Sequence, residues 1–161
     1  MTSRSSFNRR SFLKTLSAAA LTAPFVTSDL IAKPRNGVLQ HASFGAGGQA
    51  WSDIRELVRS KRMHLVAVAD VDLRHTAQLK KLFPRTKIYQ DWRELLDREG
   101  KRIDSVNVST PDHMHGPIAM SALQLGKNVY CQKPLAHDLY EVRKLTEFAH
   151  WKGVVTQMGI Q

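Results

Sequence analysis

The chain has few of the features that assign a protein quickly to a class. It contains one cysteine, Cys131, in 161 residues, so no intramolecular disulfide can form and cysteine usage does not indicate the redox compartment. It has no internal repeat and no low-complexity segment. An apolar, alanine-rich run at residues 15–26 is too short to span a bilayer, so no stable membrane span is expected. The length allows one domain with a proper core, not two.

Acidic residues are in deficit, with 14 Asp and Glu against 24 Lys and Arg, which gives a net charge of +10. Residues 1–34 carry +4 of this charge, and the other 127 residues carry +6. There the basic residues alternate with acids along expected helices and form no stripe with interleaved aromatics. This pattern favours a solvated surface that attracts anionic ligands over nucleic-acid binding.

The N-terminal segment has the charge pattern of an export signal. Residues 9–14 (Arg-Arg-Ser-Phe-Leu-Lys) precede the short apolar run, and this order resembles a twin-arginine signal. Ala23 and Ala32 are candidate cleavage points. The alternative is a basic tail before a short helix. The resemblance implies a signal peptide and linker over 1–34, the twin-arginine machinery as a partner, and a periplasmic or other extracytoplasmic location. That route carries folded proteins, so a cofactor would be acquired before export.

The stretch at 44–50 has the pattern G-x-G-x-x-A between a strand-like run (38–44) and a helix-like run (48–60). Gly45 permits a tight turn, and Gly47 lets the backbone approach a pyrophosphate. Ala50 allows close packing of helix on strand, while Gly48 and Gln49 lie at a helix N-terminus that offers free N–H groups. We therefore predict that these residues bind a dinucleotide. The alternative is a structural turn.

An acidic residue follows at the expected distance. Residues 64–69 form the second expected strand, which ends at Asp70, 25 positions after Gly45. An acid near this spacing binds the adenosine ribose, and its charge would repel a 2′-phosphate. Asp70 therefore favours NAD over NADP as cofactor. Arg74, one helical turn further on, leaves NADP open.

Strands and helices alternate along the rest of the chain. Four further strands are expected at 87–89, 105–109, 129–131 and 154–160. Three aspartates are placed to cap helices: Asp72, Asp91 and Asp138. Asp91 and Glu94 are expected to form a capping box, and Glu141 follows Asp138 at the same spacing. Such alternation predicts an α/β fold with a doubly wound parallel sheet in a domain spanning 35–161. Ligands bind beyond the carboxyl ends of such strands, which makes 45–50, 70–72, 109–115 and 132–134 the functional candidates.

From about residue 38 onward the chain resembles the N-terminal half of the Gfo/Idh/MocA oxidoreductases. Four stretches carry the resemblance: 40–48 (Gln-His-Ala-Ser-Phe-Gly-Ala-Gly-Gly), 69–72 (Ala-Asp-Val-Asp), 109–115 (Ser-Thr-Pro-Asp-His-Met-His) and 126–135 (Gly-Lys-Asn-Val-Tyr-Cys-Gln-Lys-Pro-Leu). The last is the most specific, since it matches the family's GKHVxxEKP pattern. The resemblance implies a Rossmann fold that binds NAD(P), and hydride transfer between nicotinamide and a hydroxyl of a sugar or cyclic polyol.

The resemblance also implies roles for single residues. Lys133 would lie near the nicotinamide and the substrate hydroxyl as the catalytic group, and Thr110, Pro111 and His113 would line the nucleotide. Gln132 stands where the family has glutamate. Its amide can still bind a cofactor ribose, but it supplies no charge beside Lys133 to support acid–base chemistry.

Two further expectations concern what the chain does not contain. In the family a substrate domain follows the sixth strand, so we expect this chain to be a fragment, inactive alone, whose parent forms a homo-oligomer through that domain. The alternative function is a non-catalytic dinucleotide-binding or sensing module. No metal site is predicted, because the candidate ligands have no recognised spacing: His113, His115, Cys131 and His137.

Overall fold

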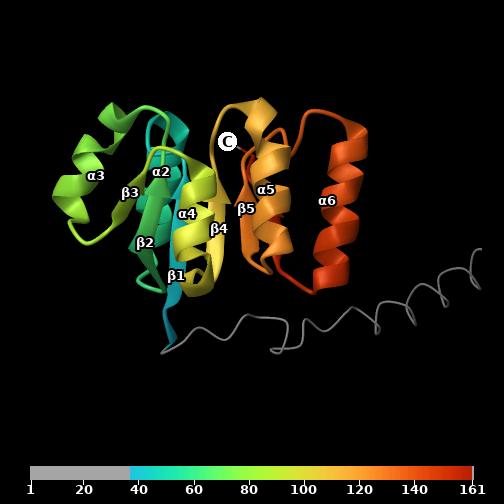
Figure 1. Cartoon of the computed structure of the whole chain (residues 1–161), viewed down its shortest axis with the longest axis horizontal. Coiled ribbons are helices and arrows are strands. Elements are labelled where there is room, and N and C mark those ends of the chain that lie inside the picture. The colour runs from blue at the N-terminus through green and yellow to red at the C-terminus, as the bar shows by residue number, and fades with distance from the viewer. Residues whose placement is uncertain (1–36, 161) are drawn as a thin grey trace, which may run out of the picture.

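The computed structural model describes residues 37–160, and the expected export signal at 1–34 lies outside the described residues. Its centre is a six-stranded, wholly parallel sheet in the order β3-β2-β1-β4-β5-β6 (Figure 1). The strands are β1 (Leu39–Phe44), β2 (Met63–Ala69), β3 (Lys87–Tyr89), β4 (Ser105–Val108), β5 (Asn128–Cys131) and β6 (Thr156–Met158). The predicted doubly wound parallel sheet is confirmed.

Helices connect the strands and cover the sheet. The α-helices are α2 (Gly48–Arg59), α3 (Ala77–Leu82), α4 (Trp92–Glu99), α5 (His115–Gln124) and α6 (Leu139–Lys152). Short 3-10 helices occur at η3 (Leu73–Thr76), η4 (Gly100–Arg102) and η5 (Asp112–Met114). In Figure 1, α4 and α5 lie in front of the sheet and α2 lies behind it. Within 37–160 no helix is both long and apolar enough to cross a membrane.

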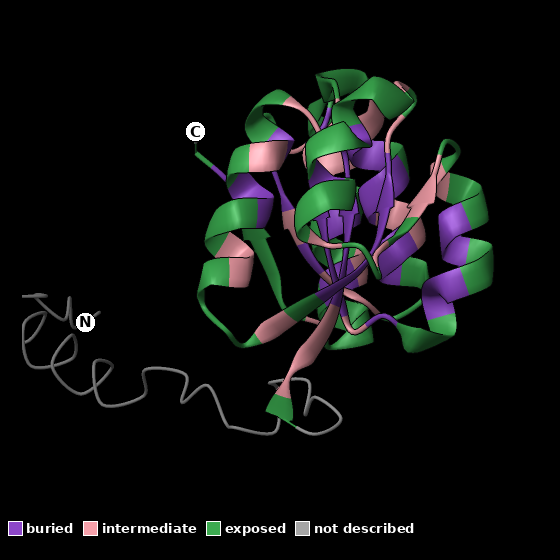
Figure 2. Cartoon of the chain, turned by 90° about the vertical axis from the view of Figure 1, so that its left-hand side faces the viewer, coloured by how far each residue is buried: buried purple, intermediate pink, exposed green. Residues whose placement is uncertain are grey.

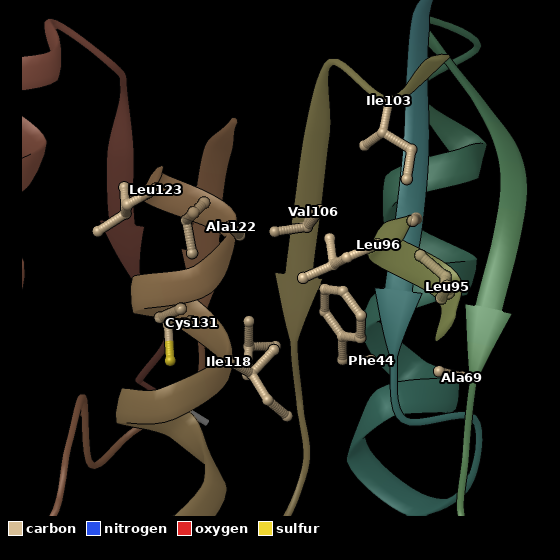
Figure 3. Close-up of a cluster of buried hydrophobic side chains, with 14 of the residues drawn as sticks. Phe44, Ala69, Leu95, Leu96, Ile103, Val106, Ile118, Ala122, Leu123 and Cys131 are labelled. Atoms are coloured by element: carbon tan, nitrogen blue, oxygen red, sulfur yellow. The ribbon is translucent and has the colours of Figure 1, made fainter. Parts of the chain in front are cut away.

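Alternate strand residues build a separate core on each face, because side chains point to opposite sides along a strand. Phe44 and Val106 are fully buried and pack with Ile118 of α5 (Figure 3). On the other face Ile54 of α2 packs with Val68 of β2. Burial of each such large side chain contributes about 1.5–3 kcal/mol to stability. Figure 2 shows the buried residues concentrated on the strands and on the inner sides of the helices.

The three predicted aspartate caps are present. Asp72 accepts a hydrogen bond from the Arg74 amide at 3.0 Å, and Asp91 accepts one from the Arg93 amide at 2.9 Å. Asp138 accepts one from the Glu141 amide at 2.8 Å. These side chains occupy N–H groups that a helix start leaves without partners.

Two local expectations differ from the structure. The reciprocal capping box at Asp91 does not form, because the Glu94 carboxylate pairs instead with Arg98, one turn along the same helix, at 2.9 Å. The helix expected after Asp72 begins as the 3-10 turn η3 and becomes α-helical at Ala77. Both differences have local causes. At Asp91 the competing partner of Glu94 is Arg98, four residues on, and after Asp72 the first turn adopts 3-10 geometry before the α-helix begins.

Candidate functional site

A cleft of about 1090 Å³ opens beyond the carboxyl ends of β1, β2 and β4. Here the strand order changes direction, because β2 and β4 lie on opposite sides of β1. Seven of the predicted cofactor-binding residues line the cleft: Gly45, Gly47, Gln49, Asp70, Thr110, Pro111 and His113. Four others lie outside its lining: Gly48, Ala50, Gln132 and Lys133.

Gly45 makes the turn from β1 toward α2 at a point where no side chain fits. Its φ is +102°, a conformation that L side chains rarely adopt. A Cβ on Gly45 would stand 2.5 Å from the Ser109 carbonyl oxygen and 2.9 Å from the Ala50 Cβ. Ala50 itself is buried against the strand. The loop therefore passes directly over the end of β4, and the small residue at 50 lets the helix pack onto it.

The N-terminus of α2 faces the cleft without a capping side chain. Gly47 is the N-cap residue in extended conformation, and no acidic residue occupies the first turn. Gly48 follows with φ +50° and no atom within 4 Å of a built Cβ. Free N–H groups and the helix dipole at such an end attract anions such as a pyrophosphate.

Asp70 lies at the end of β2 and closes one side of the cleft. Its carboxylate accepts hydrogen bonds from the backbone N–H of Ala46 at 2.8 Å and of Asp72 at 2.9 Å. The imidazole Nδ1 of His75 lies 3.2 Å from it. Asp70 is thus tied to the glycine loop, which places its carboxylate beside the position expected for an adenosine ribose.

Arg74 pairs with Asp72 and is not among the residues that line the cleft. Its guanidinium forms a bidentate ion pair with Asp72, with nitrogen–oxygen distances of 2.6–3.0 Å. The hydrogen bonds from Arg74 lower the pKa of the Asp72 carboxyl to about 2. Arg74 is the residue that could bind the 2′-phosphate of NADP. In this structure its guanidinium already has an anionic partner, because both carboxylate oxygens of Asp72 accept its hydrogen bonds.

The segment after β4 contributes the opposite wall of the cleft. Thr110 carries a buried hydroxyl, Oγ1, that has no hydrogen-bond partner among the described residues. Buried polar atoms are normally paired, so an unpaired hydroxyl on a residue that lines a cleft is a candidate for a bond with a ligand. His113 lies in η5 and is exposed at the rim.

His115, the first residue of α5, ties this segment to the turn after β5. Its ring is buried, with Nδ1 2.6 Å from the Pro134 carbonyl oxygen and Nε2 2.8 Å from the Thr110 carbonyl oxygen. Both oxygens are acceptors. The imidazole therefore connects the two segments that carry the predicted residues Thr110 and Lys133.

Gln132 and Lys133 follow β5. The Gln132 side chain is buried and its amide donates to Asp53 at 3.0 and 3.1 Å, while Lys133 is exposed. The peptide between Lys133 and Pro134 is cis. Lys133 is thus placed outside the large cleft, and its backbone follows an anchored, buried glutamine.

The residues considered as metal ligands have other surroundings. Burial raises the pKa of the Cys131 thiol to about 12, which keeps it protonated. His115 is directed at two carbonyl oxygens. Within the part of the chain that the structure describes, no three His, Cys, Asp or Glu side chains gather as a metal site.

Sequence reasoning missed Asp53 and His75. Asp53 is buried in α2 and accepts hydrogen bonds from three side chains: Gln49, Ser109 and Gln132. Its position three residues after Ala50, on the apolar stripe of the helix, is the signal that would have found it. His75 lies in the turn η3, whose start the Asp72 cap marks, but no sequence pattern indicates that its ring packs against Gly47.

The residues present fit a dinucleotide. Open space surrounds Gly48 where a Cβ would stand, and the α2 N-terminus has no capping side chain. Asp70 and Thr110 line the same cleft, and the Thr110 hydroxyl has no partner among the described residues. This donor and acceptor set suits a pyrophosphate flanked by sugar hydroxyls.

Comparisons with known proteins agree with this geometry. Residues 39–160 match the model of the Gfo/Idh/MocA family, described as an oxidoreductase family with an NAD-binding Rossmann fold. A glycosyl hydrolase family 109 protein of Shewanella putrefaciens is 27% identical over 88% of this chain and 37% of its own length. An inositol 2-dehydrogenase of Rubrobacter xylanophilus is 31% identical over 64% of this chain and 28% of its own length.

A solved structure, that of GenD2 from gentamicin A biosynthesis in complex with NAD, superposes with a TM-score of 0.69 at 30% identity. The match covers 76% of this chain and 34% of the GenD2 chain. The chain therefore spans about a third of the length of these proteins.

Proposed function

The chain belongs to the Gfo/Idh/MocA oxidoreductase family, and we propose that it is the cofactor-binding part of an enzyme that transfers a hydride between nicotinamide and a sugar or cyclic polyol hydroxyl. The matched relatives support this substrate class, since one is named an inositol dehydrogenase and another a glycosyl hydrolase. Bound NAD would supply the hydride acceptor, and the protein would fix its position against the substrate.

The observation that carries the proposal is a cleft lined by Gly45, Asp70 and Thr110, the last with a buried hydroxyl that has no partner among the described residues. Asp70 would accept hydrogen bonds from the adenosine ribose, and the α2 N-terminus would hold the pyrophosphate. Lys133, beyond the end of β5, would donate a hydrogen bond to the substrate hydroxyl or take its proton. We assign NAD as the preferred cofactor, because Asp70 repels a 2′-phosphate and Asp72 holds Arg74.

Thr110→Val provides a sharp test of nucleotide binding. The hydroxyl has no partner within the described protein, so its removal should leave the free energy of unfolding unchanged or slightly raised. If it bonds the nucleotide, NADH affinity should fall about 2- to 10-fold, as for one lost hydrogen bond. Energy transfer from tryptophan to nicotinamide would measure this, since Trp92 lines the cleft.

Thr86→Val is the matched control. The Thr86 hydroxyl donates to the Leu65 carbonyl at 2.8 Å, outside the cleft lining. This variant should lose about 1 kcal/mol of stability and keep its NADH affinity. Failure of the folded wild-type chain to bind NADH would reject the proposal.

Two other functions remain as distinct outcomes. A non-catalytic dinucleotide-binding module is favoured by the neutral Gln132, and it predicts NADH binding without turnover on any sugar or polyol. Hydrolysis of a glycosidic bond is favoured by the match to the Shewanella protein. A hydrolase would release sugar from an aryl glycoside without net NADH formation. Assays of NADH formation and of sugar release, on the wild type and on Lys133→Met, separate the three.

We also propose that residues 1–34 direct export of the folded domain by the twin-arginine route. The support is the Arg9-Arg10 pair ahead of a short apolar run. Replacing both arginines with lysine should retain the protein in the cytoplasm, whereas lysine at Arg4 should not. Cell fractionation would measure the outcome, and unchanged export of the Arg9/Arg10 variant would contradict the assignment.

A further inference from the structure

A buried carboxylate lies under the turn that carries Lys133. Asp53 of α2 is 8% exposed, and its oxygens accept hydrogen bonds from neutral donors on three other residues. The Gln132 amide contacts both oxygens at 3.0 and 3.1 Å, the Ser109 hydroxyl donates at 2.7 Å, and the Gln49 amide at 2.9 Å. Burying a carboxylate is costly unless donors replace its water, and these donors do so.

A chain of hydrogen bonds leads to the same carboxylate along β1 and β4. The Ser105 hydroxyl lies 2.9 Å from His41 Nδ1, and His41 Nε2 lies 2.9 Å from Asn107 Oδ1. The Asn107 amide donates to the Ser109 hydroxyl at 3.0 Å, and Ser109 donates to Asp53. Because Asp53 can only accept, every donor in the series points toward it, and such aligned bonds strengthen one another.

The carboxylate also determines which way the Gln132 amide faces. Nε2 must point to Asp53, which leaves Oε1 to accept from the Lys133 backbone N–H at 3.4 Å. On the other side, a Cβ on Gly159 would stand 2.5 Å from Oε1, so the side chain is closely confined. A glutamate at 132 would place a second carboxylate about 3 Å from the first, where both cannot easily ionise.

We propose that Asp53 is the positioning residue of the 132–134 turn and holds the negative charge that position 132 lacks. It acts through Gln132 on the backbone of Lys133 and does not itself contact the substrate. The role of Lys133 in this statement rests on the proposed function. In this chain the acid therefore lies on the facing helix at position 53, and the amide at position 132 donates to it.

Exchanging the two groups tests the proposal in the full 161-residue chain. Gln132→Glu should lower the melting temperature by about 10 °C at pH 8, and by roughly half as much at pH 5.5, where the two carboxylates can share a proton. Asp53→Asn removes the charge and should lower it modestly at both pH values. The double variant Asp53→Asn/Gln132→Glu restores one acid facing one amide, and should melt above Gln132→Glu at pH 8.

Nuclear magnetic resonance reports the positioning directly. The Gln132 side-chain amide should exchange slowly with solvent in the wild type and rapidly in Asp53→Asn, and the Lys133 backbone amide should shift in that variant. In the double variant the Lys133 signal should move back toward its wild-type position. Asp97→Asn and Gln124→Glu, at exposed positions, are the matched controls and should change none of these values.

Three results would overturn the proposal. The first is a difference in melting temperature between Gln132→Glu and wild type that is the same at pH 8 and pH 5.5. The others are a double variant that melts no higher than Gln132→Glu at pH 8, and a Lys133 amide signal that does not move in Asp53→Asn. None of these readouts uses a nucleotide. If the wild type binds no NADH while the exchange behaves as described, the proposed function fails and the positioning role stands. If the wild type binds NADH normally while the Lys133 amide does not move in Asp53→Asn, the positioning role fails and the proposed function stands.

Discussion

The imidazole ring of His75 lies directly against Gly47, so close that a Cβ on the glycine would stand 2.8 Å from the ring. The same ring has Nδ1 3.2 Å from the Asp70 carboxylate, and its side chain is 50% exposed. His75 thus links the glycine loop to the acid at the end of β2. A substitution at Gly47 or at Asp70 should therefore move the His75 ring, because the ring contacts both residues.

Gly47→Ala should therefore have two separable effects. The methyl group displaces a half-exposed side chain, so the loss of stability should be about 1 kcal/mol and should disappear in a His75→Ala background. NADH affinity should fall about tenfold in both backgrounds, because the methyl group keeps the pyrophosphate from the backbone. Urea unfolding and fluorescence titration measure the two quantities.

Gly45→Ala is the contrasting variant. Its Cβ meets the Ser109 backbone carbonyl at 2.5 Å, and its φ is +102°. Neither constraint can be relieved by a side chain, so this variant should lose about 2–4 kcal/mol whether or not His75 is present. Rescue of Gly45→Ala by His75→Ala would show that the loop is softer than the structure indicates.

Asp70→Ala should weaken NADH binding about tenfold or more, because a charge-assisted hydrogen bond contributes about 1.5–3 kcal/mol. NADPH binding should change less, so the preference for NAD should narrow. Parallel titrations with both nucleotides measure the ratio, and Asp97→Ala at an exposed site of α4 is the control. Equal losses for both nucleotides would contradict a role of the carboxylate in cofactor choice.

Stability should depend on the protonation of His41. Burial, opposed by the hydrogen bond with Asn107, lowers the pKa of this imidazole to about 4. Between pH 4 and the ordinary value near 6.5 the unfolded chain then binds more protons than the folded chain, so stability rises with pH across this range. The contribution is on the order of 3 kcal/mol, fully present above pH 6.5 and lost as pH falls toward 4.

Urea unfolding at pH 4.5, 5.5 and 7 tests this assignment. His41→Gln removes the titrating group, so the pH dependence of its unfolding free energy should be flatter than that of the wild type. His64→Gln, at an exposed position of β2, should keep the wild-type slope. Parallel pH profiles for wild type and His41→Gln would exclude His41 as the source.

His115→Phe should remove both links between the Thr110 segment and the Pro134 turn. A neutral imidazole donates to one of the two carbonyl oxygens, and that part-buried oxygen loses its donor in the variant, which costs about 1–3 kcal/mol when no water replaces it. Both stability and NADH affinity should fall, because the two segments are no longer held together. His137→Phe, at an exposed position nearby in the chain, should change neither. A stable variant with normal affinity would show that the segments are held by other contacts.

Much of the fold could be predicted because its signals are local. The glycine loop, the acid after β2 and the caps at Asp72, Asp91 and Asp138 depend on residues a few positions apart. Strand β3 was predicted with its observed bounds, Lys87–Tyr89, and the other strands within a few residues. Local prediction was wrong about the Asp91 capping box, where Glu94 had a second partner in Arg98.

The sequence alone thus determined the order of the elements, the parallel sheet and the edge of the sheet at which the cleft opens, because hydrophobic period and turn residues act over short distances. Only the tertiary structure decided that Asp53 faces Gln132, 79 positions away, and that His115 connects two separate turns. Such contacts depend on the register of strands and the tilt of α2. The strand register and the helix tilt depend on packing among many residues that are distant in the sequence, so no short sequence pattern predicts these contacts.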